Sequence, residues 1–163
     1  MTGRTTISSN LWLARVIALA VPALLIAGAY IAQYGFGLYP CEMCWWQRYP
    51  HFAAIVLALL AFAIRPVRLW VVLAALAILL SGAIGAYHAG VEYGWWYGIT
   101  SCARLDVPQG ANALDTIMNT PMIRCDEAQW RLFGISLAGW NFLISTLGGL
   151  SVFWLLLRKD PEA

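Results

Sequence analysis

Four long apolar segments, separated by more polar connections, dominate the hydrophobic pattern of this chain of 163 residues. A membrane-spanning helix needs about 20 apolar residues to cross a hydrocarbon core of roughly 30 Å. Three of the segments have this length and almost no charged residues: 11–34, 69–87 and 134–157. The pattern therefore predicts at least three membrane spans.

The remaining apolar segment is shorter, because only sixteen uncharged residues separate Arg48 from Arg65. We predict a span over 45–64, which begins with Trp45 and Trp46 in the interfacial region where tryptophan is common. Arg48 then lies just inside one edge of the membrane.

The composition agrees with a membrane protein. Hydrophobic residues make up 61% of the chain and charged residues 11%, less than half of the roughly 25% found in ordinary soluble domains. So few charges could not cover a water-facing surface. The net charge of +2 offers no basic field for phosphates, which argues against a nucleic-acid partner. We predict a single integral-membrane domain over 1–163, of the all-α class.

The short connection 65–68 predicts that the second and third spans are antiparallel neighbours in a four-helix transmembrane bundle. Six of the ten basic residues then share one face: Arg4, Arg15, Arg65, Arg68, Arg158 and Lys159. By the positive-inside rule this face and both termini are cytoplasmic. The outer loops 35–44 and 88–133 lie on the other side, and the first span is interpreted as an uncleaved anchor.

The second outer loop is longer than compact connections usually are, which is typical of functional loops. Leu114, Ile117 and Met118 recur within it at helical spacing. This pattern predicts a short amphipathic helix that lies on the membrane surface.

All four cysteines lie in the outer loops, on the side of the membrane where disulfides persist: Cys41, Cys44, Cys102 and Cys125. Cys41 and Cys44 form a Cys-X-X-Cys motif that runs into a predicted helix, whose dipole and free amides stabilise a thiolate. Arg48 follows Cys44 by one helical turn. Its guanidinium can reach a thiolate or an anionic cofactor oxygen.

Several interpretations of the cysteines stay open. A static Cys41–Cys44 disulfide would close too small a loop to constrain much chain entropy, whereas a Cys102–Cys125 disulfide would stabilise a longer one. A four-cysteine zinc site usually repeats its close spacing, but 22 residues separate Cys102 from Cys125, so no metal site is predicted. Two pairs on one face, one beside a helix end and a cation, favour dithiol–disulfide exchange.

Electrons taken up by these cysteines need an acceptor. The sequence has no haem-attachment motif, iron–sulfur motif or dinucleotide fingerprint. A membrane quinone is the natural candidate, since it could approach Cys44 and Arg48 from the lipid. The cation would then favour the developing quinone anion.

The chain shares a set of residues with one known family: Cys41-X-X-Cys44-X-X-X-Arg48, Cys102, the segment 125–136 and the pair Trp140-Asn141. This set resembles the DsbB family of disulfide bond formation proteins over nearly the whole chain. The resemblance implies a multi-pass protein of the bacterial inner membrane with periplasmic cysteine loops. It also implies an enzyme that reoxidises DsbA, a periplasmic thioredoxin-like dithiol oxidase, with ubiquinone or menaquinone as acceptor.

The resemblance assigns a role to each cysteine. Cys102 would be attacked by the partner's thiolate, with Cys125 as its intramolecular mate. Cys41 would accept electrons from that pair, and Cys44 would contact the quinone with assistance from Arg48.

The roles of the two histidines stay open. His88, at the outer end of the third span, is a candidate quinone-side histidine or a hydrogen-bonded interfacial one, and His51 is open in the same way.

Two alternatives to this function remain. One is a non-enzymatic tetraspan membrane module whose disulfides are static. The other is an enzyme whose partner is more specialised than DsbA.

Overall fold

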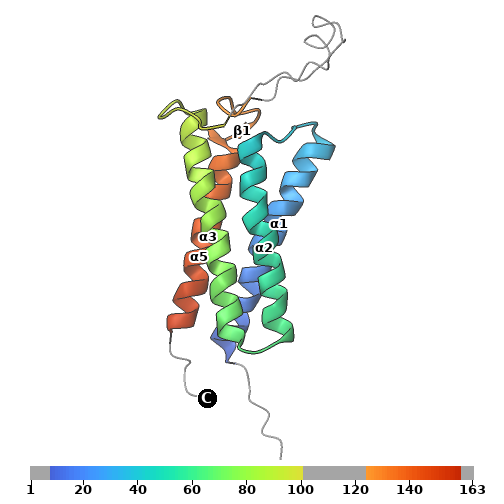
Figure 1. Cartoon of the computed structure of the whole chain (residues 1–163), viewed down its shortest axis with the longest axis vertical. Helices are drawn as coiled ribbons and strands as arrows, with labels where there is room; N and C mark the ends of the chain where they lie inside the picture. The colour runs from blue at the N-terminus through green and yellow to red at the C-terminus, as the bar shows by residue number, and fades with distance from the viewer. Residues whose placement is uncertain (1–7, 101–123, 159–163) are drawn as a thin grey trace, which may run out of the picture.

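The structure is a computed structural model that describes residues 8–100 and 124–158. In this part of the chain, four helices run side by side as a bundle (Figure 1). They are α1 (Ser9–Gly35), α2 (Glu42–Ala63), α3 (Val67–Glu92) and α5 (Leu137–Leu157). The predicted all-helical bundle is thus confirmed for the described residues, with one addition, a short hairpin of β1 (Arg131–Leu132) and β2 (Ile135–Ser136).

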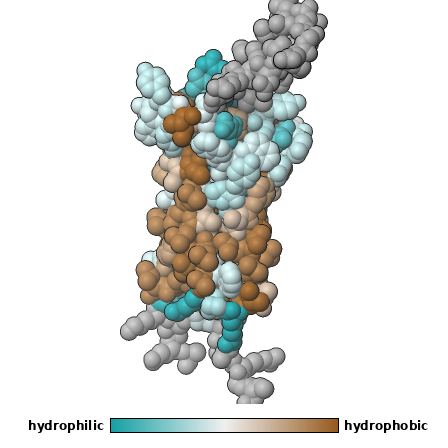
Figure 2. Space-filling model, in the orientation of Figure 1, coloured by the Kyte–Doolittle hydropathy of each residue, from teal (hydrophilic) through white to brown (hydrophobic). Residues whose placement is uncertain are grey.

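Three of these helices, α1, α3 and α5, are long and apolar enough to cross a membrane. Figure 2 shows a broad band of hydrophobic side chains over the middle and lower bundle. Below this band, a narrow rim of hydrophilic side chains lies at the bottom of the described residues. The helix α2 does not meet the same standard of apolarity, because Gln47, Arg48 and His51 interrupt its first half. All three side chains are buried, so α2 turns its polar residues toward its neighbours.

Two helices begin or end outside the predicted spans. The helix α2 starts at Glu42, before position 45, because the Cys41 sulfur caps its first turn by accepting a hydrogen bond from the Cys44 N–H at 3.3 Å. The helix α3 continues to Glu92, past the predicted end at 87. His88 therefore lies on the helix α3, and the first residues of the predicted outer loop 88–133 are helical.

The last helix starts later than predicted, at Leu137 instead of 134, because the hairpin occupies the preceding residues. Its two-residue turn consists of Phe133 and Gly134, which both have positive φ, 53° and 79°. This turn geometry matches the twist of paired strands. Ser136 then caps α5, since its hydroxyl accepts a hydrogen bond from the Gly139 N–H at 3.1 Å.

Two predictions concern positions beyond the described residues. The amphipathic helix expected around Leu114, Ile117 and Met118 lies outside them, and so does Cys102.

Glycines allow α3 and α5 to approach closely. A Cβ atom added to Gly85 on α3 would lie 2.9 Å from the Ala138 carbonyl oxygen and 2.9 Å from Asn141 Nδ2, both on α5. On α5, a Cβ atom at Gly149 would lie 2.6 Å from the Leu79 side chain of α3. Small residues at such positions let helix backbones pack tightly within a membrane.

Small side chains also fill the core at the end of the bundle that holds the α2–α3 connection. The fully buried residues there are mostly alanine: Ala14, Ala18, Ala58, Ala61, Val71, Ala74, Ala75 and Val152. Small side chains thus pack the four helices together at this end, whereas most of the buried polar side chains lie toward the other end.

Replacing Gly85 with alanine should destabilise the bundle, because the new methyl group would overlap α5. Overpacking of this kind costs about 1–3 kcal/mol. Thermal unfolding in detergent, followed by circular dichroism, measures the effect. Gly28→Ala is the control, since a Cβ atom there meets nothing within 4 Å. Equal melting temperatures for the two variants would contradict the close packing of α3 on α5.

Candidate redox site

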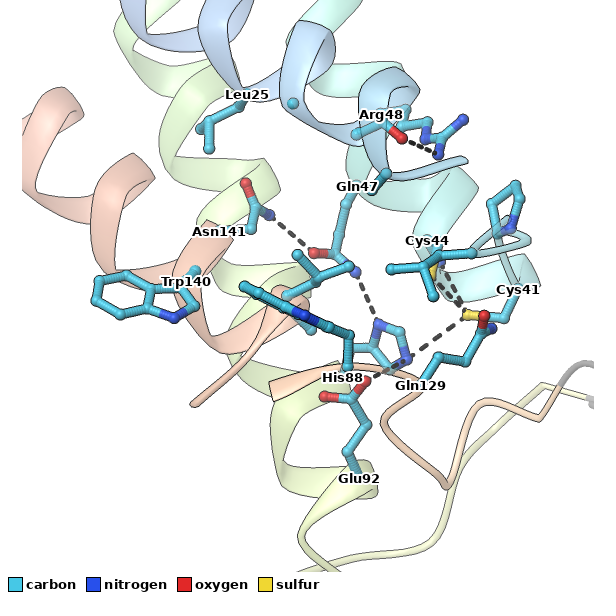
Figure 3. A pocket seen from close by; sticks show the side chains of 18 of the residues that line it. Leu25, Cys41, Cys44, Gln47, Arg48, His88, Glu92, Gln129, Trp140 and Asn141 are labelled. Carbon is cyan, nitrogen blue, oxygen red and sulfur yellow. Dashed lines mark hydrogen bonds and ion pairs between the residues drawn. The ribbon is translucent and has the colours of Figure 1, made fainter. Parts of the chain in front are cut away.

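All four helices line a cavity of about 460 Å³ at the end of the bundle that carries the β-hairpin (Figure 3). Pockets for small molecules have volumes of this order. The polar side chains that line it include Cys44, Gln47, Arg48, His88, Glu92 and Asn141. The cavity is thus lined by four residues that the sequence singled out for chemistry, Cys41, Cys44, Arg48 and His88, together with polar residues that it did not.

The Cys-X-X-Cys motif borders this cavity at the start of α2. Cys41 is 4% exposed and Cys44 is half-buried. Both are free, and their sulfur atoms lie 2.9 Å apart. The hydrogen bond with Cys44 and burial raise the pKa of Cys41. The two sulfurs can therefore be joined or separated with little movement of the backbone, and the Cys41 thiolate needs a stabilising partner.

Cys125, from the second predicted pair, lies beside the first pair. It is disulfide-bonded and buried, and it belongs to the same hydrophobic cluster as Cys41, Met43 and Val91. Its sulfur accepts a hydrogen bond from the Thr100 hydroxyl at 3.4 Å. The fold thus brings a sulfur from the segment before α5 next to the start of α2.

Arg48 is only 6% exposed. Its guanidinium donates hydrogen bonds to the Gln33 side-chain oxygen at 2.7 Å and to the Ala29 carbonyl oxygen at 3.4 Å. It also lies 4.9 Å from the ring centroids of both Tyr30 and Trp45. None of the ion pairs within residues 8–100 and 124–158 includes Arg48. Dipoles and aromatic faces therefore hold this cation at the cavity, where its charge can act on an anionic group.

His88 lines the cavity and is only 2% exposed. Its Nε2 is 3.6 Å from the Cys41 sulfur and 3.7 Å from a carboxylate oxygen of Glu92. Its Nδ1 is 2.8 Å from the side-chain nitrogen of Gln47. Figure 3 shows the ring between Gln47 on one side and Cys41 on the other. The histidine therefore contacts Cys41 of the Cys-X-X-Cys motif directly.

Sequence inspection did not identify Gln47 as part of the site and noted Asn141 only within the family resemblance. Asn141 donates a hydrogen bond to Gln47 Oε1 at 2.8 Å and accepts one from His51 Nε2 at 2.8 Å. The sequence did contain a signal for both residues, since each is a polar residue in an apolar helix. Such residues are expected to face the bundle interior and pair with one another.

Pro50 provides a second local signal. A proline within a helix lacks an N–H and disturbs the hydrogen bonds of the preceding turn. The carbonyl that loses its partner is that of Trp46, four residues before the proline. Pro50 therefore marks the turn of α2 that carries the polar residues, and the neighbouring Gln47 carbonyl accepts a hydrogen bond from the Ser81 hydroxyl of α3 at 2.8 Å.

Comparison with known proteins identifies the family. A family model described as disulfide bond formation protein DsbB matches residues 10–155. The chain belongs to the DsbB family. The family resemblance seen in the cysteine motifs is therefore confirmed.

Two relatives illustrate how far the similarity extends. Disulfide bond formation protein B of Verminephrobacter eiseniae is 36% identical over 150 residues, which cover 88% of this chain and 84% of the relative. The protein of the same name from Paracidovorax citrulli is 32% identical over 167 positions, covering 91% and 90%. No solved structure matches the chain. Membership in the DsbB family supports a membrane disulfide oxidoreductase that acts in disulfide bond formation.

Proposed function

We propose that this DsbB-family chain reoxidises a DsbA-like periplasmic dithiol oxidase and passes the electrons to a membrane quinone, ubiquinone or menaquinone. The electrons move through Cys102–Cys125 and then through Cys41–Cys44. The observation that carries the proposal is the convergence on one cavity of a free cysteine pair and a buried cation, with a buried disulfide sulfur beside them.

The cavity suits a lipid-soluble ring. Apolar side chains of α1 and α5 line much of it, among them Leu24, Leu25 and Ile144. Leu24 is 72% exposed and Ile144 39% exposed, so the cavity lining continues onto the lipid-facing surface of the bundle. A quinone bound there supplies a two-electron, two-proton acceptor. Arg48 is the cation that would bind a negative charge on such a ligand.

Each thiol–disulfide exchange in this scheme is balanced. The partner's dithiol becomes a disulfide as the Cys102–Cys125 bond opens, and that pair closes again as the Cys41–Cys44 bond opens. Each exchange moves two electrons and needs no further oxidant. The packing of Cys125 in the Cys41 cluster supports a short path for the second exchange.

We also propose that the cysteine end of the bundle faces the periplasm of a bacterial inner membrane. Arg65, Arg68 and Arg158 belong to the opposite end, where α2, α3 and α5 have their other termini (Figure 1). Positive charge of this kind marks the cytoplasmic side. Both chain termini would then be cytoplasmic.

Cys44→Ser should abolish quinone reduction by a reduced DsbA-like protein in the purified chain, because the cysteine next to the acceptor is lost. The absorbance of the quinone follows the reaction. Thiol labelling of the unaltered chain, after reductant and again after quinone, provides the second measurement. Turnover in the variant, or cysteines that never change state, would instead support a tetraspan module with static disulfides.

Arg48→Ala should lower kcat/KM for the quinone roughly 10- to 100-fold, which corresponds to the loss of a hydrogen bond to a charged group. Steady-state kinetics over a range of quinone concentrations measures this. Arg15→Ala is the matched control, since Arg15 is also a buried arginine of the bundle but stacks on Phe62 at the opposite end. An equal loss in both variants would remove the proposed role of Arg48.

Gly28→Leu should raise the KM for quinone at least several-fold, because the new side chain would extend from the cavity wall. Gly28 lines the cavity, and a Cβ atom there meets nothing within 4 Å. Gly28→Ala adds only one methyl group and should raise the KM far less. The same kinetic assay compares the two. If leucine left the KM unaltered, the quinone would bind elsewhere.

A further inference from the structure

Two backbone carbonyls determine how the Gln47 and Asn141 side chains are oriented. The side-chain nitrogen of Gln47 lies 3.2 Å from the Met43 carbonyl oxygen, and that of Asn141 lies 3.2 Å from the Ser81 carbonyl oxygen. A carbonyl oxygen only accepts hydrogen bonds, so the nitrogen of each amide must face it. Neither amide can be reversed without placing two oxygens against each other.

These orientations decide where the proton of His88 lies. Because the Gln47 side-chain nitrogen carries hydrogens, the His88 Nδ1 at 2.8 Å must accept. A neutral imidazole has one proton, which therefore resides on Nε2. The other contacts of Asn141 are consistent with this orientation of its amide. Its Oδ1 accepts hydrogen bonds from His51 Nε2 at 2.8 Å and from the Ser145 hydroxyl at 3.1 Å.

The protonated nitrogen of His88 faces the redox pair. Its Nε2 lies 3.6 Å from the Cys41 sulfur and 3.7 Å from a Glu92 carboxylate oxygen on the same side of the ring (Figure 3). The ring also makes a hydrogen bond with the Cys125 backbone, so the N–H is shared among neighbouring acceptors. Cys41 is buried, and its sulfur accepts one backbone hydrogen bond, from the Cys44 N–H at 3.3 Å. A further donor would stabilise the thiolate, because a buried charge is costly unless it is well hydrogen-bonded. A neutral N–H at this position stabilises the thiolate without the further cost of burying a second charge.

We propose that Gln47, itself oriented by Asn141, is a positioning residue that holds His88 as a hydrogen-bond donor to the Cys41 thiolate. This inference rests on the proposed function, because it concerns the exchange between the two cysteine pairs. It assigns His88 to Cys41 and not to the quinone. It also gives the Gln47 and Asn141 amides a role in the reaction, which is to orient the His88 ring.

The step that benefits is the release of Cys41 from a mixed disulfide with the second pair. The free thiolate of that pair attacks the sulfur bound to Cys41 and forms the Cys102–Cys125 bond. The bond to Cys41 breaks, and its electron pair remains on Cys41 as a thiolate. The His88 N–H then donates to this leaving group, while the total numbers of electrons and protons are unchanged.

The same proton position argues against a metal site. The ligand atoms of Cys41, Cys44 and His88 lie within 4.8 Å of one another, which would suit a metal ion. A ring nitrogen that carries a proton has no lone pair for a metal. Binding there would require both amides to reverse against their carbonyls.

Nitrogen-15 NMR of histidine-labelled full-length chain in lipid nanodiscs tests the proton position without partner or quinone. The chain has only two histidines, so His51→Gln assigns both rings. We expect His88 to carry its proton on Nε2. A proton on Nδ1 would overturn the inference and leave the proposed electron path untouched.

Gln47→Glu tests the positioning role, because a carboxylate oxygen would accept a hydrogen bond from His88 Nδ1. We expect the NMR spectrum to show Nδ1 protonated. In a background where Cys41 is the single cysteine, the pH midpoint of its alkylation should rise by about one unit, a tenfold change in thiolate fraction.

A double-mutant cycle separates action through His88 from a direct effect of the new charge. In a His88→Leu background, Gln47→Glu should leave the alkylation midpoint of Cys41 unaltered. Ser151→Ala is the control in both backgrounds, since that hydroxyl bonds only within the exposed face of α5. A shift of equal size with and without His88, or an unprotonated Nδ1 in Gln47→Glu, would overturn the positioning role.

Discussion

The hydrogen bonds of Asn141 are the interaction on which the polar half of this bundle depends. In a membrane, a buried amide must find its partners within the protein, because lipid provides none. Asn141 finds them on two other helices, Gln47 of α2 and Ser81 of α3. The missing side chain of Gly85 provides the space, since a Cβ atom there would lie 2.9 Å from the amide nitrogen. The close packing of α3 on α5 and the hydrogen bonds of Asn141 therefore depend on each other.

The bundle has two ends with different physical tasks. Small side chains, mostly alanine, let the helices pack closely at one end. At the other end the helices enclose a cavity, and its polar side chains are joined by hydrogen bonds. The two ends of the bundle thus differ in how their helices are packed.

Some site residues could be predicted because their chemistry is rare in such a chain. Cys41 and Cys44 stand out by their spacing, and Arg48 by its charge in an apolar setting. Gln47 and His51 could not be assigned in the same way, since a single polar residue on a helix is compatible with many partners. The side-chain partners, the Asn141 amide for both residues and the His88 ring for Gln47, come from other helices and are a matter of tertiary packing.

The sequence by itself determined the membrane class, the helical fold, the antiparallel arrangement around 65–68 and the family, because apolar length and cysteine spacing are local properties. The tertiary structure alone decided that His88 extends α3 and faces Cys41, and that Cys125 packs beside that pair. It also decided the direction of the hydrogen bonds from Asn141 to His88. That direction depends on carbonyl oxygens of three-dimensional neighbours, which no pattern along a single chain contains.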